Sequence, residues 1–328
     1  MASTVTTLIC ITAILLCAPN SANALSEDKA STNTIEVEVD QHFISIDLSV
    51  PAEHRQAIAA AELRGHQLWL QDQAAWHTTD HLSDKKLIKV LKKLKGKNAG
   101  YLATRLNESH LDWNVAYLGN FDGQIMSVID VEVRFNKDKT KFHAIVRKPS
   151  RELDSHELSL LQARTTAFKY AYENKLLKCT EGLNTAAQYV DHNGDDYIVV
   201  YILAAGSNDN PYPMGGYHSI LINPKDYTVE SHYAQTKGCL NGQAQQEGPT
   251  KITTLMTSHI TSNLPTAFHA FMSRSFNLDI FVGIDESQIW RIRKGKISLP
   301  DISDKDDKQL QMAVSALFNP EDQSSQQE

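Results

Sequence analysis

Alternation of apolar and polar residues in the middle of the chain predicts a four-stranded antiparallel sheet. The first run, 184–191, leads to Asn193-Gly194, a dipeptide typical of a tight β-hairpin because both turn residues must adopt φ > 0. Three similar runs follow, at 197–203, 216–222 and 227–233. Apolar residues at helical spacing over 155–177 predict a helix in front of this sheet.

The same order of elements occurs earlier in the chain. Helical spacing predicts helices at 52–75 and 84–94. Alternation then predicts four strands, at 101–107, 111–118, 124–135 and 141–146. Residues Asp112–Tyr117 also match Asp196–Tyr201 in pattern. We therefore expect an internal duplication, visible as repeated architecture.

The two ends of the chain complete a predicted α+β fold class. Residues 34–50 predict one or two strands, and 250–276 predict a helix interrupted near Pro265. A hairpin at 279–293, a strand at 296–299 and a helix at 304–318 follow. The predicted segments are a signal peptide (1–24), a spacer (25–33), a first module (34–149), a second module (150–240), a flexible linker (241–249), a C-terminal helix and hairpin unit (250–318) and a disordered tail (319–328).

The first residues have features of a secretory signal peptide. Leu8–Cys17 is apolar, and Ser21–Ala24 supplies the small residues that a signal peptidase needs, which predicts cleavage near Ala24. No Lys or Arg precedes the apolar run, which departs from the usual pattern. The run is too short to cross a bilayer, and a lipid anchor at Cys17 is the alternative. We expect a periplasmic or secreted protein.

Cleavage there would leave two cysteines, Cys179 and Cys239, one at each end of the second predicted sheet. An oxidising compartment and an even number of cysteines predict a disulfide between them. Two separate buried thiols are the alternative. Closing a loop of this length would stabilise the fold by up to about 4 kcal/mol in the chain-entropy description.

Composition and missing motifs narrow the function classes. The 328 residues are 41% hydrophobic and 22% charged, which suits two or three globular domains. A net charge of −7 argues against a nucleic-acid partner, because such proteins neutralise phosphates with excess Lys and Arg. The sequence lacks the Gly-x-Ser-x-Gly, P-loop, dinucleotide-binding and Cys-x-x-Cys motifs of common enzymes. We expect no cofactor.

His77, Asp80 and His81 form the sharpest chemical pattern. Two histidines four residues apart share a helix face and can chelate zinc. The order resembles the inverted zincin motif His-x-x-Glu-His, but the shorter Asp carboxylate reaches less far toward an attacking water. A third ligand would be needed, for which Glu152 and Glu157 lie downstream. The alternative is an ordinary solvated helix end.

Two surfaces are candidates for contact with a partner. The predicted helix 84–94 has a basic face that could meet an acidic partner or an anionic membrane, although such faces are often simply solvated. This face includes Lys85, Lys89, Lys92 and Lys93. The loop before the third strand of the second sheet carries side chains that suit partner recognition, unless they pack back onto the sheet. These are Tyr212, Met214 and Tyr217.

A helix followed by a four-stranded antiparallel meander, twice in one exported chain, resembles the PepSY and cystatin-like modules of bacterial secreted proteins. The resemblance covers about 34–239 and rests on element order, so no family residue is carried over. It implies a non-catalytic binding or inhibitory module. The segment from Leu264-Pro265-Thr266 to Ile289-Trp290 is similar to uncharacterised exported proteobacterial proteins, which adds no function.

These observations favour an exported, non-enzymatic protein that binds another protein. An inhibitor or immunity-type protein acting on a secreted enzyme is the concrete form of this hypothesis. A metal-dependent hydrolase that uses His77 and His81 is one alternative. A structural envelope protein whose lysine-rich helix touches anionic lipid is another.

Overall fold

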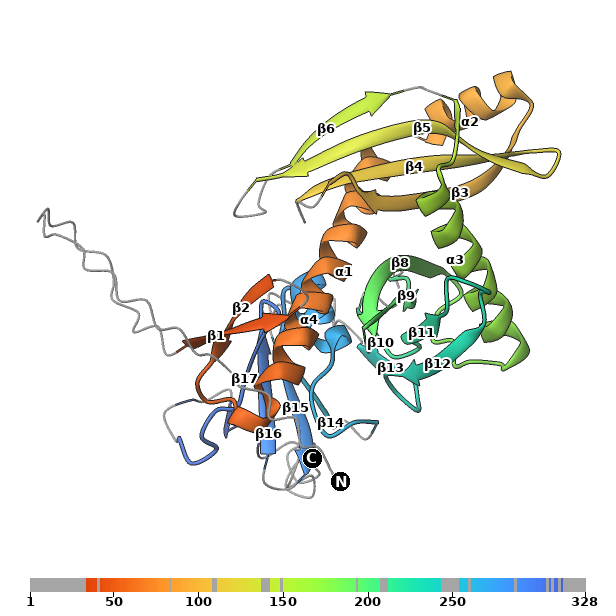
Figure 1. Ribbon diagram of the computed structural model, residues 1–328. Helices are drawn as coiled ribbons and strands as arrows, with labels where there is room; N and C mark the ends of the chain where they lie inside the picture. Colours follow the sequence, from red (N-terminus) through yellow and green to blue (C-terminus); the bar gives the residue numbers. More distant parts are fainter. Residues whose placement is uncertain are drawn as a thin grey trace, which may run out of the picture. The chain divides into compact units, whose positions relative to one another are not determined.

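The computed structural model of the protein combines helices with small, mainly antiparallel sheets, which confirms the α+β class (Figure 1). The described residues are 34–39, 42–82, 84–107, 111–136, 142–147, 150–192, 194–206, 212–242, 254–258, 261–285, 288–304, 307, 310–311 and 314. The predicted signal peptide, spacer and tail lie outside these ranges, as does most of the predicted linker.

A hairpin and a long helix begin the described chain. Strands β1 (Thr34–Val39) and β2 (His42–Asp47) pair antiparallel, and a short 3-10 turn (Ala52–His54) follows Pro51, whose missing N–H costs little at a helix start. Helix α1 (Arg55–His81) is longer than predicted. Helix α2 (Asp84–Leu94) has the predicted bounds.

The first large sheet follows α2. Its strands lie in the order β3-β4-β5-β6, with every neighbouring pair antiparallel. The bounds are β3 (Lys97–Arg105), β4 (Asp112–Phe121), β5 (Gln124–Phe135) and β6 (Phe142–Arg147). A two-residue strand, β7 (Arg151–Glu152), also pairs with β5. Strand β3 is therefore an edge strand.

The second large sheet follows helix α3 (Ser155–Glu173), which begins with a capping box between Asp154 and Glu157. Its strands lie in the order β12-β11-β9-β8 and are antiparallel, so β8 is also an edge strand. The bounds are β8 (Leu183–His192), β9 (Asp195–Ala204), β11 (His218–Ile222) and β12 (Val229–Ala234). Strands β10 (Tyr212–Met214) and β13 (Leu240–Gly242) form a separate short pair.

The C-terminal part is a third sheet with one helix. Strand β14 (Thr254–Ser258) pairs parallel with β15 (Asp279–Asp285), and helix α4 (Ala267–Ser275) lies between them in the chain. The predicted helix before Pro265 is therefore wrong, because this Thr-rich stretch is a strand, which β-branched residues favour. Strands β16 (Gln288–Arg293) and β17 (Lys296–Ser298) complete the sheet with antiparallel pairing.

Helix α1 contacts all three large sheets. One hydrophobic cluster combines Ile46 and Ile58 with Tyr201 of the second sheet and with Phe268 and Trp290 near the C-terminus. The hairpin β1–β2 and the first half of α1 thus pack with the C-terminal sheet. This packing crosses the predicted segment boundaries, which rest on sequence pattern alone.

Candidate functional site

The predicted disulfide between Cys179 and Cys239 is present. The two cysteines are separated by 60 residues, and their Cα atoms lie 5.3 Å apart. The bond joins the segment after α3 to the segment after β12. Both ends of the second sheet unit are thereby tied together, which confirms the cysteine prediction.

The predicted exposure of Met214 and Tyr217 is not found. Their exposed fractions are 4% and 1%. The Tyr217 hydroxyl donates a hydrogen bond to the Pro213 carbonyl oxygen at 2.8 Å, and its ring lies 5.6 Å from that of Phe268. These side chains pack onto the second sheet beneath α4, which leaves them no surface for a partner. The side chain of Tyr212 lies outside the described part of the structure.

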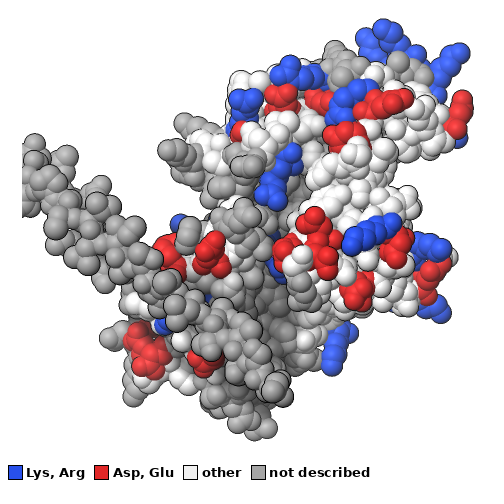
Figure 2. All heavy atoms as spheres, in the orientation of Figure 1, with Lys and Arg blue, Asp and Glu red and all other residues white. Residues whose placement is uncertain are grey.

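The predicted lysine face is exposed wherever its side chains are described. Lys89, Lys92 and Lys93 project from α2 into solvent, while Leu87 and Leu91 on the opposite face are buried. Figure 2 shows Lys and Arg atoms projecting at the upper right, where Figure 1 places α2. Exposure fits a binding surface and a solvated helix face equally well. The side chain of Lys85 is outside the described set.

The His77 pattern lies on the last turn of α1, as the helical spacing requires. The His77 ring stacks on Phe142, with centroids 4.2 Å apart. Glu157 accepts hydrogen bonds from Arg151, and Glu152 accepts one from Gln124. Among the described residues, no three His, Cys, Asp or Glu side chains form a group that could hold a metal. The side chains of Asp80 and His81 are not described, so the zinc hypothesis stays a prediction.

A cavity of about 570 Å³ opens where the two edge strands β3 and β8 approach each other. We call it the edge pocket. Its described lining residues are His42, Ala103, Thr104, Arg105, Asn107, Trp113, His156, Leu160, Ala187, Gln188 and Tyr189. They come from β2, β3, β4, α3 and β8, so elements distant in sequence build it.

Helix α1 joins the two edges through one side chain. Gln71 Nε2 donates to the Ala103 carbonyl of β3 at 2.7 Å and to the Ala187 carbonyl of β8 at 3.2 Å. Gln188 Nε2 in turn donates to Gln71 Oε1 at 2.8 Å. Gln71 is buried, so these bonds satisfy an amide that would otherwise be costly.

The bonds to Gln71 also show which way the edge backbone points. In an antiparallel strand the N–H and C=O of one residue face the same side, and the direction repeats every second residue. The backbone N–H and C=O of Ala103 point away from β4, so those of Arg105 do too. In the same way, the backbone groups of Ala187 and Tyr189 point away from β9. The carbonyl of Tyr101, two residues before Ala103, accepts from Arg164. The outward backbone groups of Arg105 and Tyr189 therefore face the edge pocket.

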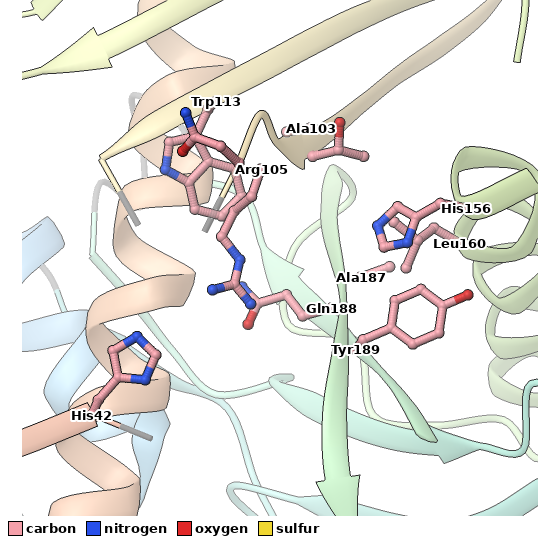
Figure 3. Close-up of a pocket in the computed structure, with 11 residues that line it drawn as sticks. His42, Ala103, Arg105, Trp113, His156, Leu160, Ala187, Gln188 and Tyr189 are labelled. Carbon is pink, nitrogen blue, oxygen red and sulfur yellow. The ribbon is translucent and has the colours of Figure 1, made fainter. Parts of the chain in front are cut away.

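Side chains give the edge pocket a basic and aromatic character. Figure 3 shows the Arg105 guanidinium beside Gln188, His42 on one side, and His156 against Tyr189 on the other. The rings of His156 and Tyr189 stack with centroids 4.7 Å apart. The described lining contains no carboxylate, and within the described residues Arg105 makes no hydrogen bond or ion pair through its side chain. Such a pocket suits an anionic group next to an extended chain.

The carboxyl group of Asp72 follows Gln71 directly on α1. Burial raises the pKa of Asp72 to about 6, and a hydrogen bond with Gln73 opposes the rise. Burial also raises the pKa of Tyr101 to about 12, and the negative charge of Asp72 adds to that rise. Asp72 is not among the described residues that line the edge pocket.

The sequence patterns did not identify the edge pocket. Its residues come from β2, from β3 and β4, from α3 and from β8, which only the fold brings together. One signal was available: Gln71 follows Leu68 by three residues and precedes Ala75 by four, so a polar residue occupies a position of the apolar stripe. A polar residue there implies a buried hydrogen-bonding role.

Comparisons with known proteins leave this site as the main guide to function. Among the described residues, no helix combines the length and apolar character needed to cross a membrane. The resemblance to PepSY and cystatin-like modules stays a prediction. No protein-family model, curated protein or solved structure matches this chain.

Proposed function

We propose that this protein is an exported, non-enzymatic binding protein that takes an extended segment of a partner protein into the edge pocket. An inhibitor or immunity-type role against a secreted enzyme is its concrete form. The observation that carries the proposal is the pair of edge strands, β3 and β8, whose outward backbone groups face one cavity. An added strand pairs with such groups, which provide affinity through main-chain hydrogen bonds.

Charge supports a partner segment that carries a carboxylate. Arg105 can form two parallel hydrogen bonds with a carboxylate, and such bonds are about twice as strong as neutral ones. Tyr189 and His156 offer a flat stacked surface beside it. An acidic side chain or a C-terminal carboxylate both supply this chemistry.

The order of elements supports a tandem arrangement of two modules. Helix α2 precedes the four-stranded meander β3 to β6, and helix α3 precedes the meander formed by β8, β9, β11 and β12. We propose that these are two modules of PepSY or cystatin-like type. In that arrangement the edge pocket is formed where the edge strands of the two modules approach each other.

Capture of a partner tests the proposal directly. The purified protein, immobilised, is exposed to the exported fraction of the producing organism, and the captured protein is identified, purified and titrated. We expect Arg105→Gln to weaken binding about tenfold or more. Arg134→Gln is the matched control, since Arg134 is exposed on β5, outside the pocket lining.

A proline variant tests the backbone contact separately. Tyr189→Pro removes an outward N–H that the strand ladder does not use, and edge positions tolerate this change. We expect it to weaken binding more than Tyr189→Ala, which removes only the side chain. Parent-like binding by both Arg105→Gln and Tyr189→Pro would refute the proposed site. Stoichiometric zinc without a captured protein would instead support the hydrolase alternative.

A further inference from the structure

A second cavity, of about 330 Å³, lies on the opposite side of the second sheet from α3. We call it the face pocket. Its walls come from β8, β9, β11 and β12 and from residues of α1 and the start of α4. Alternate residues of β9 separate the two faces: Ile198 and Val200 pack with α3, whereas Val199 and Tyr201 line the face pocket.

Arg64 of α1 supplies the charge of the face pocket. Its Nε atom is buried and has no hydrogen-bond partner within the described residues. The same residues provide no ion pair for its guanidinium. The Arg64 residue as a whole is half-buried, so its guanidinium can form charge-assisted hydrogen bonds with an anionic guest in the pocket.

The floor of the face pocket is ordered in two rows across three strands. Tyr201, Ser219 and Tyr233 are paired neighbours in one row. The Tyr233 hydroxyl lies 2.8 Å from Thr261 Oγ1, so Tyr201 and Ser219 present the hydroxyl groups of this row to the pocket. The next row is Val199, Leu221 and Ser231, of which Val199 and Leu221 are apolar. The positive charge of Arg64 acts on Tyr201, since it opposes the rise that burial causes in the pKa of that tyrosine. Arg64 thus belongs at the hydroxyl row.

The remaining polar groups at the rim are already engaged. Asp191 is the only carboxylate among the described lining residues, and its Oδ1 accepts from the Gly194 N–H at 3.1 Å. The Nε2 atom of His232 lies 3.0 Å from Nδ1 of His218. Phe268 of α4 lies against Tyr201, with ring centroids 5.8 Å apart. The two rows of the floor therefore give the pocket a charged part at Arg64, Tyr201 and Ser219, with the apolar side chains of Val199 and Leu221 beside it.

We infer that the face pocket binds a small monocarboxylic acid with an apolar body. Arg64, Tyr201 and Ser219 hold the carboxylate, and Val199 and Leu221 contact the apolar part. The volume is near the lower end of the range for ligand pockets, roughly 300–1,000 Å³, which favours a small molecule over a long lipid chain. This inference does not depend on the partner-binding proposal, because none of these side chains lines the edge pocket.

Calorimetric titration of the purified protein with hexanoate and benzoate tests the inference. The neutral controls are hexanamide and benzamide, which keep the apolar body and remove the charge. We expect saturable one-to-one binding of at least one acid, with its amide about tenfold weaker or more. Arg64→Gln should weaken acid binding by a similar factor, while Arg105→Gln should leave it unchanged.

A second variant distinguishes loss of the binding site from a folding defect in Arg64→Gln. Ser219→Leu fills the floor of the pocket and keeps the arginine, and thermal unfolding checks that both variants are folded. Loss of acid binding in both variants supports the face pocket as the site. Parent-like binding in folded Arg64→Gln, equal binding of acid and amide, or no binding of either acid at millimolar concentration would overturn the inference.

Discussion

Helices α2 and α3 each precede an antiparallel sheet, but they are packed differently. Helix α2 buries Leu87 and Leu91 against the first sheet and exposes its lysines. Helix α3 contacts the second sheet and also β3 of the first. Its buried Ala163 and Ala167 share a hydrophobic cluster with residues of both sheets, such as Leu118 and Ile198.

The difference shows how the surroundings of a helix determine its sequence. A helix that covers one sheet needs one apolar stripe, and α2 shows a strong contrast between an apolar face and a lysine-rich face. A helix that contacts two sheets needs small residues where the sheets approach it. The contrast between an apolar and a polar face is therefore weaker in α3. The first turn of α3 also carries a buried ion network, whereas α2 offers solvated charges. Changes at the first turn of α3 should therefore affect folding, whereas changes to the exposed lysines of α2 should affect only the surface.

The largest expected effect lies at the start of α3. Arg151 forms double hydrogen bonds to Asp130 of β5 and to Glu157 of α3, with donor–acceptor distances of 2.6–3.1 Å. Arg151→Ala would leave two carboxylates that are 6% and 3% exposed without their cation. We expect a loss of about 3 kcal/mol, the lower end for broken buried pairs because Arg151 is partly exposed. Urea unfolding of the parent and the variant measures this loss of stability.

Arg147→Ala is the matched control for that variant. Arg147 pairs with Glu132 on the exposed side of the first sheet, and its side chain is 58% exposed. Exposed pairs contribute about 0–1 kcal/mol. If the two variants lose equal stability, the network at α3 is no more important than a surface pair.

A desolvated carboxylate without an ion pair among the described residues should have the opposite effect. Asp72 of α1 has no ion pair within the described residues, and its pKa in the fold, about 6, is above the ordinary value of 3.8. Between these values the folded state binds more protons than the unfolded state, so stability falls as pH rises through this window. Asp72→Asn removes the charge and should stabilise the fold at pH 7 by up to about 3 kcal/mol.

Unfolding at pH 4 and at pH 7 separates this effect from a general change in packing. The gain from Asp72→Asn should fall to about 0.5 kcal/mol at pH 4, where the folded carboxyl is protonated and the unfolded one is only partly ionised. Asp122→Asn, in an exposed turn of the first sheet, is the control and should change stability by less than about 0.5 kcal/mol at both pH values. An equal gain at both pH values would contradict the charge explanation.

The capping box of α3 should contribute less. Asp154 Oδ1 accepts from the Glu157 N–H at 2.8 Å, and Glu157 Oε2 accepts from the Asp154 N–H at 3.1 Å. Asp154→Ala removes one of these bonds and should cost about 1 kcal/mol. Asp154→Asn keeps a capping oxygen and should cost less. If Asn and Ala are equally destabilising in urea unfolding, the cap does not stabilise α3.

Local patterns predicted much of the fold. The bounds of α2 and β5 match the predictions, because an amphipathic helix and an alternating strand are readable from neighbouring residues. The disulfide followed from the number and position of cysteines. Strand β14 was missed because its partner is β15, on the far side of α4. Parallel strands are joined by a crossover, here through α4, so no hairpin turn marks the pair in the sequence.

The candidate sites depended on tertiary packing, which the local pattern does not contain. Met214 and Tyr217 resemble exposed loop residues in sequence, but α4 covers them through Phe268 and Phe271. The edge pocket combines residues 103–107 with 187–189, about 80 positions apart, because Gln71 holds both edges. Arg64 and Arg105 are ordinary arginines in sequence, and only their surroundings indicate a role.

The smallest effect on stability is expected for the exposed face of α2. Replacing Lys89, Lys92 and Lys93 by Gln should change the free energy of unfolding by less than about 0.5 kcal/mol, since these side chains are exposed. Lys169, Lys175 and Lys178, also exposed, form a matched control set at the end of α3. Co-sedimentation with anionic vesicles at low and high salt provides the second measurement, because salt screens such contacts. Salt-sensitive vesicle binding that only the α2 variant loses would support the envelope alternative, and its absence would leave α2 as a solvated cover of the first sheet.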